Sequence, residues 1–271
     1  MSIRLIALDI DDTLLDSTGK ILPSTKEALQ KALKQGIKVV LCSGRPLPGV
    51  APFLKELKIT GDDQYVVTYN GSVVESVTGK VVAEAGLNND VYRQIDTYSK
   101  KHGLQYNVLD RKGNIYTSNH NVNRVSVIQA WENNAGILIR EPEEMPMDFS
   151  IVKGIFVGET EDLNQVQASV QQEFGTKNYV VRAANNFLEI MNASVNKGLG
   201  LEKLANSLNI LPEEIIVFGD EQNDIPMFDF AGQAVAMGNS SKIAKEHASY
   251  VTDSNDRNGI AKALDKLVFS A

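Results

Sequence analysis

Apolar runs alternate with amphipathic segments in the first part of the chain. The run Ile3–Ile10 is almost continuously apolar, which is typical of a strand buried on both faces of a parallel sheet. A helical pattern follows over residues 23–36, where Ser24 and Glu27 form a predicted capping box, and a second apolar strand covers Ile37–Cys42. A strand, a helix and a strand in this order predict a right-handed parallel crossover.

The pattern changes in the middle of the chain and then returns. Tyr65–Tyr69 predicts a third strand, and the pair Asn70-Gly71 predicts a two-residue hairpin after it. Residues 87–182 alternate helices with strands around polar turns, which indicates an α+β domain with an antiparallel sheet. From Lys197 onward the α/β alternation resumes. We predict an α/β core with a Rossmann-like parallel sheet, residues 1–84 and 190–271, interrupted by an inserted α+β domain, residues 85–189.

Composition narrows the class of protein. The 271 residues favour two domains, and a formal net charge of -7 argues against a surface made to bind nucleic acid or an anionic membrane. Cys42 is the single cysteine and the three histidines are far apart, which excludes an intramolecular disulfide and a zinc cluster. No segment approaches a membrane span or a secretory signal. We expect a cytoplasmic protein with a small-molecule ligand and no inferable protein partner.

Three aspartates, Asp9, Asp11 and Asp12, crowd the end of the first predicted strand. Ligands of open α/β sheets bind beyond the carboxyl ends of the strands. If the extended geometry persists past Asp9, the side chains of Asp9 and Asp11 point to the same side. Taken alone, such an acidic loop is equally consistent with a helix cap.

A second acidic loop, GDEQND at residues 219–224, follows the apolar strand IIVF. If a helical turn starts there, Asp220, Asn223 and Asp224 share one face. Two like charges 4 Å apart repel by about 4 kcal/mol at an effective dielectric of 20, so these carboxylates and Asp9 in one crevice need a cation. Oxygen donors without histidine or cysteine favour magnesium over zinc. The sequence therefore predicts a magnesium site at this edge of the sheet.

Two further segments suit a phosphate group. Lys197 and Gly198 open a predicted helix, and Ser43-Gly44-Arg45 offers a hydroxyl and main-chain N–H groups at another strand end. A lone lysine is usually a solvated surface residue, so this interpretation depends on the neighbouring loops.

Four elements in this order resemble the haloacid dehalogenase superfamily: Asp9-x-Asp11-x-Thr13, Ser43-Gly44-Arg45, Lys197, and Gly219-Asp220-x-x-Asn223-Asp224. The insert between the second and third elements, with the stretches TYNGSVV, FLEI and NKG, is similar to Cof-type hydrolases with a large α/β cap. Within these the whole chain is most similar to the YidA-like sugar-phosphate phosphatases. Asp12 stands where the family usually has glycine, but aspartate tolerates a left-handed backbone, so we expect the turn to be kept.

The resemblance implies a magnesium-dependent phosphatase in which Asp9 attacks phosphorus and forms an aspartyl-phosphate. Asp11 would protonate the leaving oxygen and then accept a proton from water. The implied magnesium set comprises Asp9, Asp11 through its carbonyl, Asp220 and Asp224. The implied phosphate-binding residues are Ser43, Gly44, Lys197 and Asn223, and Asn223 would also help to orient the metal shell. Thr13 is expected to support the loop, and Arg45 to pair with an acid inside the core.

Substrate choice is expected to lie in the cap, since the core residues address only the phosphate. Arg182, Asn185 and Asn186 are polar candidates there, although a solvated loop explains each of them equally well. The resemblance favours sugar phosphates. A phosphatase of flavin mononucleotide or pyridoxal phosphate and a sugar phosphomutase stay open. A non-enzymatic receiver domain with a phosphorylated aspartate is a remoter alternative, against which stand the insert and the second acid Asp11.

Overall fold

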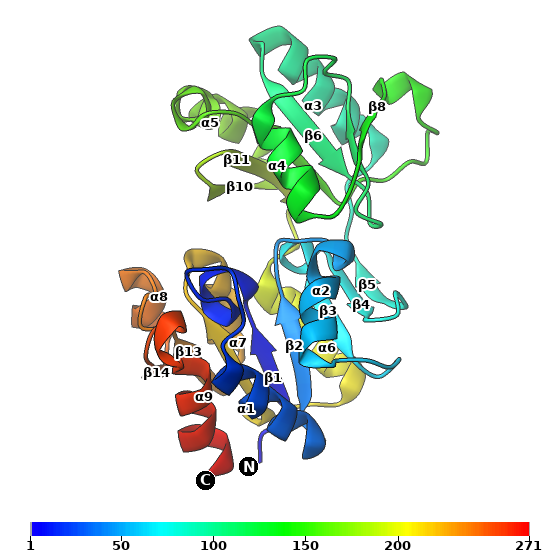
Figure 1. Ribbon diagram of the computed structural model, residues 1–271. Coiled ribbons are helices and arrows are strands. Elements are labelled where there is room, and N and C mark those ends of the chain that lie inside the picture. The colour runs from blue at the N-terminus through cyan, green and yellow to red at the C-terminus, as the bar shows by residue number, and fades with distance from the viewer. Residues whose placement is uncertain (1, 271) are drawn as a thin grey trace. The chain divides into compact units, whose positions relative to one another are not determined.

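The computed structural model describes residues 2–270 and contains two compact units (Figure 1). The core unit comprises residues up to 44, residues 50–84 and the chain from 196 onward, and the cap unit comprises Arg45–Gly49 and Ala85–Val195. Residues 190–195, expected in the core from sequence, are grouped with the cap unit, where strand β11 continues to Asn192. Among residues 2–270, no helix is long and apolar enough to cross a membrane.

An eight-stranded sheet forms the middle of the core unit, in the order β14-β13-β12-β1-β2-β3-β4-β5. The strands from β14 to β3 are parallel, whereas β3, β4 and β5 pair antiparallel. Their bounds are β1 Leu5–Leu8, β2 Lys38–Cys42, β3 Tyr65–Thr68, β4 Val73–Ser76, β5 Val81–Glu84, β12 Ile215–Gly219, β13 Gln233–Ala236 and β14 Tyr250–Val251. The predicted parallel α/β core is therefore confirmed.

Helices cover both faces of this sheet, which explains its continuously apolar strands. Leu5 and Ala7 point into one hydrophobic cluster with residues of α6, α7 and α8, while α1 packs against α9 and β2. The helices are α1 Pro23–Lys34, α2 Leu47–Leu57, α6 Lys197–Leu208, α7 Ile225–Phe230, α8 Lys242–His247 and α9 Gly259–Leu264. The carboxyl ends of the parallel strands consequently lie at one edge, where loops can gather polar side chains.

Two local predictions for the core were wrong or incomplete. The capping box was wrong: the N-cap of α1 is Leu22, Pro23 occupies the first turn, and the Ser24 hydroxyl donates to Asn258 Oδ1 over 2.7 Å. The short elements α8 and β14 were missed because six and two residues are too few to show a period.

The cap unit has a six-stranded sheet in the order β10-β11-β9-β6-β7-β8. Its strands are β6 Gln105–Leu109, β7 Ile115–Thr117, β8 Ile137–Ile139, β9 Lys153–Val157, β10 Asn178–Ala184 and β11 Phe187–Asn192, and its helices are α3 Asn89–His102, α4 Arg124–Glu132 and α5 Thr160–Phe174. The sheet is antiparallel as predicted except that β7 and β8 pair in parallel. The α+β character of the insert is confirmed, but β8, a three-residue edge strand, gave no clear pattern.

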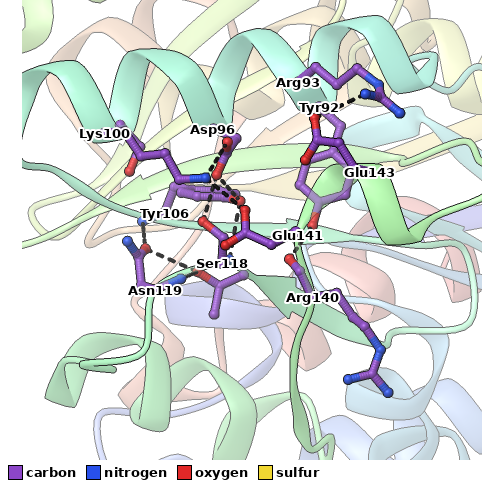
Figure 2. A network of polar contacts seen from close by, with 12 residues as sticks. Tyr92, Arg93, Asp96, Lys100, Tyr106, Ser118, Asn119, Arg140, Glu141 and Glu143 are labelled. Carbon is purple, nitrogen blue, oxygen red and sulfur yellow. Dashed lines mark hydrogen bonds and ion pairs between the residues drawn. The ribbon is translucent and has the colours of Figure 1, made fainter.

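A polar network inside the cap unit joins α3 to the sheet (Figure 2). The buried carboxylate of Asp96 accepts hydrogen bonds from Tyr106 Oη at 3.0 Å and Ser118 Oγ at 2.5 Å. Lys100 Nζ lies 3.0 Å from Asp96 Oδ2 and 2.7 Å from Glu141 Oε2. Burial raises the pKa of the Tyr106 hydroxyl, so it stays protonated and donates. Asp96 thus joins α3 to β6 and to the segment at Ser118, and Lys100 extends the network to Glu141.

Asp96→Ala is expected to destabilise the cap unit by about 2 kcal/mol, because it removes hydrogen bonds to a charged acceptor and leaves buried donors unsatisfied. Urea denaturation monitored by circular dichroism measures the change. Glu143→Ala is the matched control, since it removes the exposed ion pair with Arg93 and should cost less than about 1 kcal/mol. An equal decrease in the free energy of unfolding for the two variants would contradict a stabilising role of the buried network.

Candidate active site

Three acids and one lysine meet at the carboxyl edge of the core sheet. Lys197 Nζ lies 2.5 Å from Asp9 Oδ1 and 2.6 Å from Asp224 Oδ1, and all three side chains are buried. Asp9 follows β1, and Lys197 is the first residue of α6. Asp9, Asp220 and Asp224 each offer a carboxylate oxygen within 4.8 Å of the others. The predicted convergence of these loops is therefore present in the core unit.

Asp224 is placed by a loop that folds back on the end of β12. Its Oδ2 accepts from the main-chain N–H groups of Asp220 at 2.9 Å and Glu221 at 3.2 Å. The sequence suggested that Asp220 and Asp224 share a helical face. Instead, Asp220 directly follows β12 and lies outside the short helical turn that contains Asp224. A Cβ on Gly219 would lie 2.5 Å from the Cβ of Asp224, so only glycine permits this close approach. Both oxygens of Asp224 thus have protein partners, one of them Lys197.

The first acidic loop leaves strand geometry immediately after Asp9. Asp11 itself is extended, with φ -74° and ψ 131°, but the helical geometry of Ile10 before it interrupts the predicted strand alternation between Asp9 and Asp11. Asp9 is buried and Asp11 is exposed. Asp12 is exposed and adopts φ 57°, ψ 5°, the left-handed conformation expected where the family has glycine.

Thr13 connects the two acidic loops, as its predicted supporting role requires. Its Oγ1 donates to Asp220 Oδ1 over 2.9 Å, and both side chains are buried. Burial raises the pKa of Asp220 to about 7, the Asp224 charge adds to the rise, and the Thr13 hydrogen bond opposes it.

The electrostatics of the cluster favour a bound cation. Burial raises the pKa of Asp9, and the charges of Asp224 and Asp220 add to this effect, while Lys197 opposes it. Burial alone would lower the pKa of Lys197, but the charges of Asp224 and Asp9 outweigh burial and raise it, so the lysine stays charged. Three carboxylates therefore share one ammonium group. This surplus of buried negative charge, carried by oxygen donors alone, fits a hard divalent cation.

A second group of residues lies at the ends of β2 and β3. Ser43 is buried, and its carbonyl accepts from Asn70 N over 2.9 Å. A Cβ on Gly44 would lie 3.2 Å from Asn70 Nδ2, and Asn223 Nδ2 donates to Asn70 Oδ1 over 3.5 Å. Buried Asn70 therefore connects two of the predicted phosphate-binding segments. The sequence indicates only a turn residue at Asn70, although its place at the carboxyl end of β3 was a usable signal.

The same turn helps to place Lys197. A hairpin joins β3 and β4 as predicted, but the paired strands end at Thr68 and Val73, so its connection is residues 69–72 instead of the predicted two residues. A Cβ on Gly71 would lie 2.0 Å from the carbonyl oxygen of Asn196. Asn196 caps α6 by accepting from Leu199 N over 2.8 Å. Glycine at position 71 lets the turn approach the helix start closely, which fixes the base of the lysine side chain.

Arg45 makes its described contact within the cap unit. Its Nη1 donates to the carbonyl oxygen of Glu132 over 3.5 Å, whereas the predicted partner is an acid of the core. Its supporting role stays a prediction.

The three cap candidates lie in and near the β10–β11 hairpin, and the side chains of Arg182 and Asn186 contact main-chain atoms. Arg182 Nε donates to the carbonyl of Ala184 over 2.9 Å, and its Nη2 donates to the carbonyl of Asn185. Asn186 Nδ2 donates to the carbonyl of Gly158 over 2.6 Å. These contacts give the side chains of Arg182 and Asn186 a local structural task, whereas Asn185 takes part through its main-chain carbonyl. A role of the three residues in specificity stays a prediction.

Comparison with known proteins identifies the family. The model of the haloacid dehalogenase-like hydrolases matches residues 6–264. The chain belongs to the haloacid dehalogenase-like hydrolases. It is 33% identical to YxeH of Bacillus subtilis (strain 168), a phosphatase by name, over 98% of this chain and 99% of that one. A haloacid dehalogenase-like hydrolase from Bacteroides thetaiotaomicron has 30% identity and a TM-score of 0.89, covering 98% of this chain and 100% of the other.

A further relative of this haloacid dehalogenase-like hydrolase carries a substrate in its name. It is the 5-amino-6-(5-phospho-D-ribitylamino)uracil phosphatase YcsE of Bacillus subtilis (strain 168), 28% identical over 97% of this chain and 95% of the relative. Family and relatives together make this chain a phosphomonoester hydrolase that acts on small phosphate substrates. The non-enzymatic receiver alternative is therefore wrong.

Asp12→Gly is expected to keep activity within about threefold of the wild type, because glycine adopts the left-handed conformation freely. The Asp12 charge also raises the pKa of Asp220, so the variant should bind a divalent cation slightly less tightly. Steady-state hydrolysis of an aryl phosphate across a magnesium titration measures both effects. A hundredfold loss at saturating magnesium would show that Asp12 has a role beyond the turn.

Proposed function

We propose that this chain is a magnesium-dependent phosphatase of sugar phosphates and related small phosphomonoesters that works through an aspartyl-phosphate on Asp9. The observation that carries the proposal is the contact of Lys197 with both Asp9 and Asp224 inside a cluster with surplus negative charge. A buried lysine beside a buried carboxylate suits a nucleophile that must meet an anionic phosphate, since the ammonium group offsets repulsion between them.

The core residues then divide the reaction between them. Asp9 attacks phosphorus, and the bond from phosphorus to the ester oxygen breaks while Asp11 gives its proton to that oxygen. Asp11 then accepts a proton from water as the water oxygen attacks the aspartyl-phosphate and releases Asp9. Lys197 and the N–H groups near Ser43 and Gly44 would bind the phosphoryl oxygens.

Asp9, Asp220 and the carbonyl of Asp11 would hold the magnesium ion, which supplies charge neutralisation for the transferring phosphoryl group. Asp224 supports this set from behind, because its own oxygens contact Lys197 and two main-chain N–H groups. Asn223 would contact phosphate from the same loop, where it lies next to Asn70.

Sugar and sugar-alcohol phosphates are the preferred substrate class. The support is the named substrate of the relative YcsE, in which the phosphate sits on a ribityl chain. Flavin mononucleotide also carries a ribityl phosphate, so it is the natural second ester to test.

Phosphate release from hexose and pentose phosphates, flavin mononucleotide, pyridoxal phosphate and an aryl phosphate tests the proposal, with magnesium and with chelator. We expect turnover with magnesium, none with chelator, and the highest kcat/KM on a sugar or sugar-alcohol phosphate. A transfer of phosphate between two positions of one sugar without phosphate release would instead indicate a mutase. Turnover unaffected by chelator would contradict the magnesium assignment.

The raised pKa of Asp220, about 7, predicts competition between protons and magnesium. In the metal-free protein the neutral carboxyl contributes stability that is present below its ordinary pKa and is lost as pH rises through 7. Magnesium must displace this proton, so the rise in Tm on adding magnesium should be larger at pH 8 than at pH 6. Differential scanning fluorimetry measures it, with Asp220→Asn as the variant in which the pH dependence should be smaller, since only the raised pKa of Asp9 then contributes. An equal magnesium effect at both pH values in the wild type would contradict the competition.

A further inference from the structure

The first acidic loop is fastened to the C-terminal part of the core unit by two asparagines. Asn239 Nδ2 donates to the carbonyl oxygen of Asp12 over 2.8 Å, and its Oδ1 accepts from Asn255 N over 3.0 Å. Asn255 Nδ2 in turn donates to the carbonyl oxygen of Leu15 over 2.9 Å, in a buried contact. Asn239 follows β13 and Asn255 follows β14, and they lie 227 and 240 positions along the chain from the carbonyl groups that they contact. None of the sequence motifs included them.

The backbone of the loop shows why such a contact matters for Asp11. Asp9 is anchored because its N–H donates to the carbonyl of Phe218 over 3.0 Å, and Thr13 is anchored through Asp220. Between these two points the chain reverses at Asp12, whose φ is 57°. Aspartate tolerates a left-handed conformation, but less readily than glycine, so the conformation persists best when its surroundings hold it. The position of Asp11 therefore depends on how firmly the turn at Asp12 is held.

We propose that Asn239 is a positioning residue for Asp11. By donating to the Asp12 carbonyl, Asn239 keeps the turn in its left-handed form and so keeps the Asp11 carboxyl where it can protonate the leaving oxygen. The inference rests on the proposed function, because it assigns Asn239 to the step in which Asp11 gives up its proton as the bond from phosphorus to oxygen breaks. Asn239 itself is exposed and touches neither the acid cluster nor the reacting atoms.

The side chain of Asn239 suits this task because it uses both ends of its amide. The donor end faces a carbonyl oxygen, and the acceptor end faces an N–H group. Aspartate has the same shape and keeps only the acceptor, so Asn239→Asp removes the contact to Asp12 and retains the contact to Asn255. Asn239→Ala removes both contacts without adding a charge, which separates loss of the donor from a new charge near the loop.

The test exploits the need for a proton at the leaving oxygen. A sugar phosphate has a poor alkoxide leaving group that requires general acid catalysis, whereas p-nitrophenyl phosphate has a good leaving group that does not. We expect Asn239→Asp and Asn239→Ala to lower kcat/KM for the sugar phosphate by at least about tenfold, because general acid catalysis contributes about 10² to 10⁴. The kcat/KM for p-nitrophenyl phosphate should change by less than about threefold. Asp11→Asn should show the same split with a larger amplitude.

Ser24→Ala is the matched control, since it removes a hydrogen bond to Asn258 elsewhere in the core unit and should leave both esters unchanged. A thermal melt of each variant establishes that it is folded, which is expected because Asn239 is exposed. Equal losses on the two esters, or no loss on either, would overturn the role of Asn239. Wild-type protein that cleaves neither ester would instead contradict the proposed function, so the two failures are distinct.

Discussion

Asp9→Asn is expected to lower phosphatase activity by at least about 10⁴-fold on every ester, because it removes the proposed covalent nucleophile, on which nearly all of the rate enhancement depends. The amide has the shape of the carboxylate, and Lys197 keeps its partner Asp224, so the variant should fold. Initial rates of phosphate release measure the loss. Mass spectrometry of acid-quenched enzyme should detect a phosphate adduct on wild-type Asp9 and none on the variant.

Asp63→Asn provides the control for this substitution. Asp63 pairs with Lys38 over 3.2 Å at the surface of the same core unit, and removing its charge should leave turnover within about twofold, as is typical of exposed pairs. Residual activity of Asp9→Asn within a hundredfold of the wild type would rule out Asp9 as the nucleophile. A phosphate adduct on another residue would reassign the intermediate.

Lys197→Met is expected to have the largest effect on stability. The substitution leaves Asp9 and Asp224 buried without their cation, and breaking a buried ion pair in this way costs about 3 to 5 kcal/mol. The loss should be greater at pH 8 than at pH 5.5, because burial and the neighbouring acids raise the pKa of Asp9 and protonation relieves the repulsion at lower pH. Urea denaturation in chelator measures both values. Activity should fall as well, since Lys197 would bind the phosphoryl group.

Lys38→Met tests whether burial of the ion pair causes the large loss of stability expected for Lys197→Met. Lys38 also pairs with an aspartate and lies at the start of a core strand, but Asp63 is largely exposed, so the expected cost is about 1 kcal/mol or less. If Lys38→Met and Lys197→Met lowered the free energy of unfolding by similar amounts, the larger contribution assigned to the buried cluster would be contradicted. If the loss of stability in Lys197→Met did not depend on pH, repulsion between the carboxylates would not be its cause.

Several features follow directly from the order of residues. Apolar strands that end in acids predict a polar site at the carboxyl edge of a parallel sheet, because parallel strands place their ends together. The left-handed turn at Asp12 follows from the motif and the tolerance of aspartate for that conformation. The Asn70-Gly71 pair likewise predicts its hairpin, since both residues accept positive φ. These are short-range properties, so local sequence is sufficient.

Other features depend on contacts between distant segments. Lys197 meets Asp9 across 188 positions, Asp224 folds back on Asp220 instead of continuing a helical face, and Asn239 reaches Asp12 across 227 positions. The parallel pairing of β7 with β8 belongs to the same class. Hydrophobic periodicity shows which face of a segment is buried but does not specify which polar atoms meet there. The chain order therefore determined the architecture and the chemical character of the site, and tertiary packing alone decided which lysine pairs with which acid and what holds the first acidic loop.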